Sequence, residues 1–133
     1  MSVKGPFILL GDSSSVDGNN TVTDPFDSTS KTNNLIAIGY QAGYSNMTSA
    51  ADGTIAIGYQ ALFSLTEGQY NTAIGYESMI YQTDGDKNTT LGYKAFRTSD
   101  NGESDNVVIG YQSGLSQNHA STDRNVFISC LIV

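Results

Sequence analysis

The stretch LIAIGYQAG at residues 35–43 decides the fold, because the chain repeats it. The phrase returns as TIAIGYQAL at 54–62, NTAIGYESM at 71–79, NTTLGYKAF at 88–96, NVVIGYQSG at 106–114 and NVFISC at 125–130. Its tyrosine stands at positions 40, 59, 76, 93 and 111, with a cysteine at 130, so the steps are 19, 17, 17, 18 and 19 residues. A near-constant period of this kind means that equivalent units stack on one another.

The length of the period selects the type of unit. A repeat of this length is too short for a pair of helices, and few apolar residues recur at the spacing of an amphipathic helix. The sequence therefore predicts an all-β fold: a short parallel β-roll or β-solenoid of about six coils, each built from a strand and turns.

Side chains alternate within each phrase as they do along a strand, where every second residue points the same way. One face is bulky, with Ile38, Ile57, Ile74, Leu91, Ile109 and Ile128 directly before the glycine position and Ile36, Ile55, Thr72, Thr89, Val107 and Val126 two residues earlier. The other face is mostly small, with Ala37, Ala56, Ala73, Thr90, Val108 and Phe127, followed by Gly39, Gly58, Gly75, Gly92 and Gly110. Small residues in register let a second backbone approach, either the other half of the same coil or a neighbouring chain.

Two further sets recur with the period. An asparagine precedes four of the strands, at Asn71, Asn88, Asn106 and Asn125, and forms either a stacked amide ladder or a set of turn residues at the strand entrances. The bulky columns are Tyr40, Tyr59, Tyr76, Tyr93 and Tyr111, and then Tyr44, Phe63, Ile80 and Leu115. Since a thin roll has little interior, we expect these columns to be buried between chains; the alternative is that they fill the interior of their own roll.

The composition excludes several classes of protein. Only six basic residues face thirteen acidic ones, a net charge of −7, so nucleic acid is not an expected partner. Apolar runs do not exceed four residues, which predicts no membrane span, no signal peptide and a soluble protein that is not exported. A single cysteine, Cys130, excludes an internal disulfide. Cys130 and His119 lack a third group for nucleophilic catalysis, so we expect no enzyme and no cofactor.

Acidic residues lie between the phrases. Asp84, Asp86 and Asn88 have the spacing that opens a calcium loop, and Asp100, Asn101, Glu103 and Asp105 form a second acidic group. The glutamate expected eleven residues after the first aspartate is absent, because position 95 is alanine. Hydrated loop tips are the favoured interpretation, and no metal site is expected.

The ends of the chain differ from the repeats. Residues 1–33 form an N-terminal segment in which FILLGD at 7–12 resembles a degenerate first coil, followed by a long polar loop, and residues 34–133 form the β-roll domain. Terminal coils leave strand edges that must be capped or docked. The expected docking residues are Phe7, Ile8, Leu131, Ile132 and Val133.

The repeated phrase resembles two known groups of proteins. Repeats of the form N-x-A-I-G followed by a small-residue turn resemble the left-handed parallel β-roll of trimeric autotransporter adhesin heads, and AIGYQAG resembles repeats in bacteriophage fibre and other virion proteins. The resemblance covers residues 34–130 and implies a trimer of rolls around a threefold axis. The adhesin heads usually have shorter repeats, a secretion signal, a coiled-coil stalk and a membrane anchor, none of which is found in this sequence.

The resemblance and the composition together predict a virion structural protein. We expect a homotrimeric decoration or cement protein, or a head fibre, made in the host cytoplasm and bound to the major capsid protein or another virion protein on the capsid surface. The alternative is a tail-fibre or adhesin-like module that binds cell-surface glycans through its loops and tyrosines.

Overall fold

The computed structural model describes the backbone of residues 8–11, 15–17 and 21–24, and the backbone and side chains of residues 35–45, 47, 51–97, 102–115 and 123–129. Nine strands are found there: β1 (Ile8–Gly11), β2 (Ser15–Asp17), β3 (Thr21–Asp24), β4 (Leu35–Ile38), β5 (Ile55–Ile57), β6 (Thr72–Ile74), β7 (Thr89–Leu91), β8 (Val107–Ile109) and β9 (Val126–Ile128). The described part of the chain contains no α-helix.

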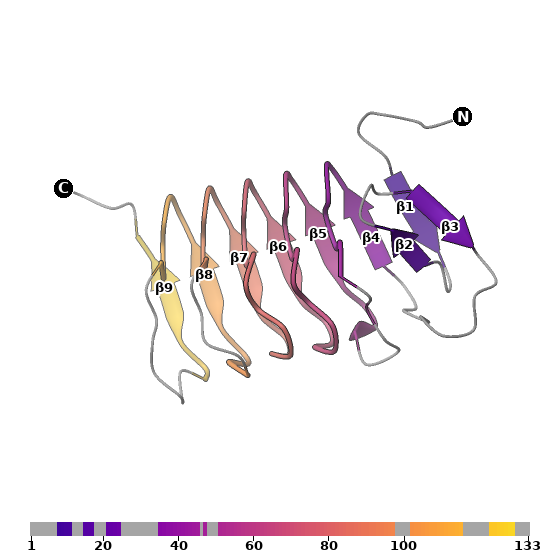
Figure 1. The fold of residues 1–133 in the computed structure, drawn as a ribbon. Coiled ribbons are helices and arrows are strands. Elements are labelled where there is room, and N and C mark those ends of the chain that lie inside the picture. Colours follow the sequence, from indigo (N-terminus) through magenta and orange to yellow (C-terminus); the bar gives the residue numbers. More distant parts are fainter. Residues whose placement is uncertain are drawn as a thin grey trace.

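Strands β4 to β9 form a parallel β-solenoid, as the repeat predicts (Figure 1). Each strand pairs in parallel with the strand of the next coil, and the register joins equivalent positions of the repeat, such as Ala37 with Ala56 and Ile57 with Ile74. The chain returns through turns and loops on the other side of each coil. The expected columns of equivalent residues are therefore real columns in the structure.

The N-terminal segment differs from a degenerate coil. Strand β1 pairs with β4 in the antiparallel direction, Ile8 opposite Ile38 and Gly11 opposite Leu35, whereas a coil of the stack would pair in parallel. Strands β2 and β3, within the expected polar loop, form a separate antiparallel pair. Strand β1 thus covers the first edge of the parallel sheet, and the backbone of Ile8, an expected docking residue, is engaged in that pairing.

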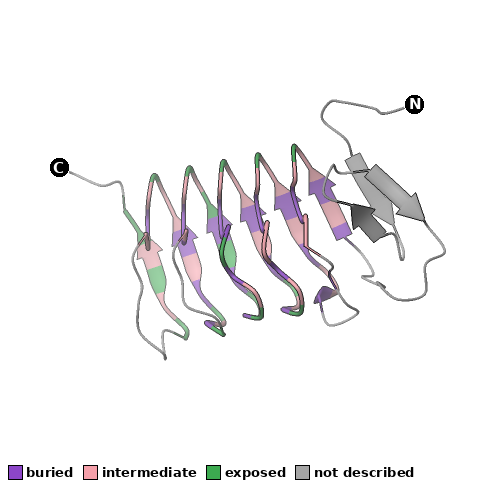
Figure 2. Ribbon diagram, in the orientation of Figure 1, coloured by how far each residue is buried: buried purple, intermediate pink, exposed green. Residues whose placement is uncertain are grey.

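In strands β4 to β8 the small face is the buried one (Figure 2). Ala37, Ala56 and Ala73 are fully buried, and the bulky residues on either side of them are only partly covered. The second backbone that approaches the small face is therefore the other half of the same coil, which settles the choice that the sequence left open.

Several of the bulky side chains of the interior come from the turns. Leu62, Met79 and Phe96 follow the glycine of their coil by four residues and are fully buried. They have φ angles of 50°, 51° and 52°, in the left-handed region that most side chains avoid. This conformation turns them inward, so the tight arch after the glycine supplies a large side chain to the core in the second, third and fourth coils.

Candidate functional site

The outer face of the parallel sheet carries an extensive apolar surface. Its bulky positions are Ile36, Ile38, Ile55, Ile57, Thr72, Ile74, Thr89, Leu91, Val107, Ile109, Val126 and Ile128, which we call the outer apolar face. All of them are partly or fully exposed, because alternate residues of each strand fill the interior. Contiguous apolar surface of this kind is typical of an interaction site.

A column of stacked tyrosine rings borders the outer apolar face, since each ring follows directly after the glycine of its coil. We call Tyr40, Tyr59, Tyr76, Tyr93 and Tyr111 the tyrosine ladder. Neighbouring ring centroids are 4.9–5.3 Å apart and the ring planes are 7–17° from parallel. The rings are 39–50% exposed, so the tyrosines do not fill the interior of their own roll.

The second bulky column divides between two environments. Ile80 is buried within its own chain, as the alternative for this column predicts. Tyr44, Phe63 and Leu115 are half-buried, and the rings of Tyr44 and Phe63 stack with their centroids 4.6 Å apart. The fourth coil has Arg97 at this position. This column is therefore partly core and only partly available to a partner.

An ion-pair network, which the sequence reading missed, lies beside the tyrosine ladder. The Glu77 carboxylate accepts a hydrogen bond of 2.9 Å from Nε of Arg97, and Nζ of Lys94 lies 3.6 Å from the same oxygen. Lys94 also lies over the ring of Tyr93, 5.1 Å from its centroid. The signal was a column of glutamines, Gln41, Gln60 and Gln112, in which two adjacent coils carry Glu and Lys instead.

The network controls the charge of Glu77. Burial disfavours the carboxylate and by itself raises its pKa. Hydrogen bonds from Arg97 and Tyr76, with the positive charges of Lys94 and Arg97, outweigh that effect and leave the pKa of Glu77 below its ordinary value. The carboxylate is thus ionised at neutral pH and links the third coil to the fourth.

Replacing Glu77 by glutamine should lower the free energy of unfolding at pH 7 by about 1 kcal/mol, because a charged hydrogen bond is lost. A group with a lowered pKa stabilises the fold above its unfolded pKa, and this contribution disappears as the pH falls through the folded pKa. The difference between wild type and Glu77→Gln, measured by urea unfolding, should therefore shrink below about pH 4.5. Asp105→Asn is the control, since the exposed pair of Asp105 with Arg124 is 3.9 Å long, and a pH-independent difference for Glu77→Gln would contradict the assignment.

The asparagines form the amide ladder. Nδ2 of Asn88, Asn106 and Asn125 donates to Oδ1 of the asparagine one coil before, over 3.1–3.3 Å. The same oxygen also accepts the backbone N–H of the following asparagine, over 2.9–3.1 Å. Because a backbone N–H can only donate, these contacts fix which amide atom is the oxygen. The residues stand at the strand entrances as well, so both expected roles are combined.

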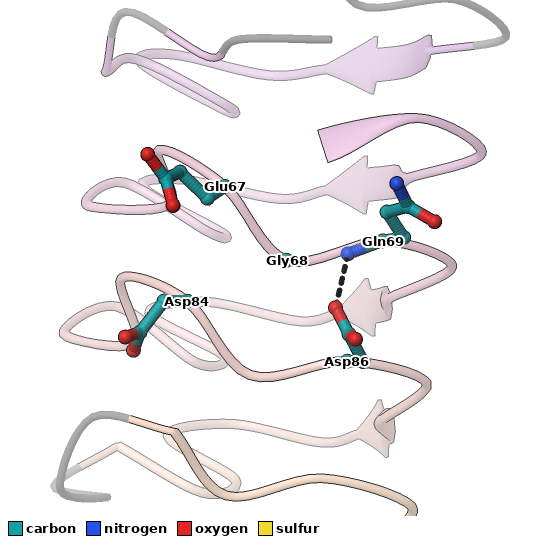
Figure 3. Close-up of a pocket in the computed structure, with 5 residues that line it drawn as sticks. All are labelled: Glu67, Gly68, Gln69, Asp84 and Asp86. Carbon is teal, nitrogen blue, oxygen red and sulfur yellow. Dashed lines mark hydrogen bonds between the residues drawn. The ribbon is translucent and has the colours of Figure 1, made fainter. Parts of the chain in front are cut away.

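An acidic pocket of about 300 Å³ lies on the loop side, lined by Glu67, Gly68, Gln69, Asp84 and Asp86 (Figure 3). Oδ1 of Asp86 accepts a hydrogen bond of 2.7 Å from the backbone N–H of Gln69, so this carboxylate links two neighbouring coils. Figure 3 shows the Asp84 carboxylate turned away from that of Asp86, and Asn88 is buried in the amide ladder. The three residues with calcium-loop spacing therefore do not converge on one point. Within the described residues, no three His, Cys, Asp or Glu side chains gather as metal ligands.

Several residues named from the sequence lie outside the described residues. They are the docking residues Phe7, Leu131, Ile132 and Val133, the pair His119 and Cys130, and Asp100 and Asn101 of the second acidic group. Glu103 and Asp105 of that group are described, and Glu103 is buried while Asp105 is exposed. The repeat columns, in contrast, are all described from Ile38 to Ile128.

Comparison with known proteins identifies no relative. No protein-family model, no curated protein and no solved structure matches the chain. In the described part of the chain there is also no helix long and apolar enough to cross a membrane. Function must therefore be argued from the surface itself.

Proposed function

We propose that this protein is a structural component of a virion: a homotrimeric β-roll that decorates or cements a phage capsid. The observation that carries the proposal is the outer apolar face, with the tyrosine ladder at its border. Its side chains point away from the coil because neighbouring residues of a strand alternate between two faces, and the buried small residues between them take the inward positions. Covering an apolar surface of this kind with another surface removes it from water and lowers the free energy of the system.

Three copies cover such faces economically. When three rolls pack around one axis, each with its flat sheet face toward the axis, all three faces are buried together. Because the symmetry is closed, none of the faces remains free to bind further copies. The trimer is also what the resemblance to adhesin heads and phage fibres implies. The tyrosine ladder supports the same arrangement, because tyrosines combine large apolar rings with hydroxyl groups that remain hydrated at the rim.

The role at the capsid would be mechanical. A protein that binds only the assembled lattice stabilises it by mass action, and no chemistry is needed for that effect. The loop side of the solenoid suits an outer surface, because it carries exposed acidic side chains such as Glu67, Asp84 and Asp105, which stay hydrated and repel similar particles. The docking contact itself is assigned to the ends of the roll.

The tyrosine ladder weighs against the alternative of glycan binding. Sugar rings stack on the faces of aromatic rings, but in the ladder each inner ring covers the faces of its neighbours, with centroids about 5 Å apart. Only ring edges and hydroxyl groups face outward from Tyr59, Tyr76 and Tyr93. The trimeric structural role therefore remains the function that we propose.

Replacing Ile57 by lysine should convert the trimer to a monomer. Ile57 lies on β5, the second of the six strands of the outer apolar face, and is half-buried in the single chain, so a lysine there keeps the fold but places a charge in the threefold contact. The mass by analytical ultracentrifugation should fall from about three times 14.2 kDa to about 14.2 kDa. Glu67→Lys, on an exposed loop, is the control and should stay trimeric. A wild-type protein that is monomeric at all concentrations would overturn the trimer.

The location on the virion requires a separate experiment. Gold-labelled antibody against the protein should mark the shells of purified particles, and deletion of the gene should leave adsorption to the host intact while particles lose resistance to heat. Label confined to tails, or loss of adsorption with unchanged shells, would support the glycan-binding alternative and overturn the capsid role. These outcomes do not depend on the oligomeric state.

A further inference from the structure

The two edges of the seven-stranded sheet are treated differently. At the first edge β1 covers β4. At the last edge stands β9, and no strand lies beyond it within the residues that the structure describes. The backbone groups of an edge strand form a template on which another strand can add, which makes this edge worth examining.

The inner coils show which groups of β9 face that open edge. The N–H of Val107 donates to the carbonyl of the next coil over 2.9 Å, and the carbonyl of Ile109 accepts an N–H of the next coil over 3.1 Å. The equivalent residues of β9 are Val126 and Ile128. Their N–H and C=O groups therefore point to the place of a following coil. Their side chains are 67% and 70% exposed, against 46% for Leu91 in an inner coil.

The amide ladder ends at the same edge. Oδ1 of Asn106 accepts two hydrogen bonds from Asn125, one from the backbone N–H and one from Nδ2. Oδ1 of Asn125 stands in the equivalent place and accepts none from the described residues. This oxygen, the N–H of Val126 and the carbonyl of Ile128 repeat the contact pattern that the coils of Asn71, Asn88 and Asn106 offer to the next coil.

We propose that the β9 edge is a docking site for a partner polypeptide, which adds one strand parallel to β9 with an asparagine at its entrance. The asparagine would donate to Asn125, and the strand would complete the bonds of Val126 and Ile128. A small or apolar residue at its centre would cover Phe127, which is only half-buried. Addition of a strand to an exposed edge is a common mode of peptide recognition.

The occupant is a different protein and not a second copy. The equivalent first coil of another copy is already covered by its own β1. The inference uses only β8, β9 and the amide ladder, so it holds whether or not the rolls form trimers.

Hydrogen exchange of the full chain, followed by NMR, tests the proposal. The probe is a synthetic peptide with the sequence of residues 71–78, NTAIGYES. In the free protein the Val126 amide should exchange rapidly while the Val107 amide is protected, and saturating peptide should slow the Val126 amide by about tenfold or more. A peptide with leucine in place of its asparagine should bind about tenfold more weakly.

Three outcomes would overturn the proposal. The first is protection of the Val126 amide in the free protein at low concentration, which would mean that the chain covers its own edge. The second is protection that grows with protein concentration in the absence of peptide, which would make a second copy the occupant. The third is an exchange rate of the Val126 amide that saturating peptide does not change.

A variant gives an independent readout of the same site. Val126→Pro removes the N–H that faces the open edge, and that N–H makes no bond to β8, so the near-ultraviolet circular dichroism of the tyrosine ladder should be unchanged while peptide binding is lost. Peptide binding that survives in a folded Val126→Pro protein would contradict the docking geometry. Should the variant not fold, the leucine-substituted peptide decides the question on wild-type protein.

Discussion

Gly75→Ala should unfold the solenoid under conditions in which the wild-type protein is fully folded. Gly75 has a φ of 140°, a region that residues with a Cβ atom rarely adopt. A methyl group there would lie closer than van der Waals contact to both the carbonyl oxygen and the carbonyl carbon of Gly92. Backbone is the part of the neighbouring coil that cannot move aside, because it is bonded to the coils above and below.

The expected loss is about 3 kcal/mol or more, from backbone strain and overlap together. Gly102→Ala separates the two effects, since Gly102 also has a positive φ, of 96°, but no atom lies near its Cβ position. That control should lose about 1 kcal/mol. Urea unfolding followed by far-ultraviolet circular dichroism measures both. Equal, small losses for the two variants would show that the glycine column is not needed for the approach of successive coils.

The glycine column explains why the sequence predicted so much of the fold. A backbone position that only glycine can occupy, repeated at a near-constant interval, fixes where each coil turns, and the alternation before it fixes the strand and its register. The stacking of equivalent residues follows, including the amide ladder, because layers about 4.8 Å apart bring identical side chains into contact.

Other features depend on contacts that a period does not encode. The alternation identified two faces of each strand but not which of them is inside, because that depends on the turns. Leu62, Met79 and Phe96 have left-handed backbone conformations in these turns, and their side chains enter the coil and leave room mainly for small side chains on the facing strand. The direction of β1 was equally hidden, since an isolated apolar strand pairs with an edge in either direction. The Glu77 network was missed because Glu77 and Lys94 occupy a column that is otherwise neutral glutamine, while Arg97 occupies the second bulky column, so the period does not bring the three residues together.

Asn88→Asp should destabilise the fold almost as strongly as Gly75→Ala, although it changes only one NH₂ group to an oxygen. Asn88 is fully buried. Its Nδ2 donates to Oδ1 of Asn71 over 3.2 Å and to the carbonyl of Glu103 over 2.7 Å, while its Oδ1 accepts from Asn106. An aspartate keeps the acceptor but turns both donor contacts into contacts between oxygens, with a negative charge in a site closed to water.

The expected loss is about 3 kcal/mol at pH 7, from one charged and two unsatisfied polar groups. Because the size of the side chain is unchanged, the loss cannot be attributed to a cavity. Asn125→Asp is the matched control at the end of the ladder, where the residue is half-buried and its longer contacts of 3.3 Å are partly open to water, so about 1 kcal/mol should be lost. Equal losses for Asn88→Asp and Asn125→Asp would mean that burial of the ladder does not strengthen it. The predicted gradient follows from stacking, because an amide inside the stack depends on a neighbour on each side, and the terminal amide depends on one.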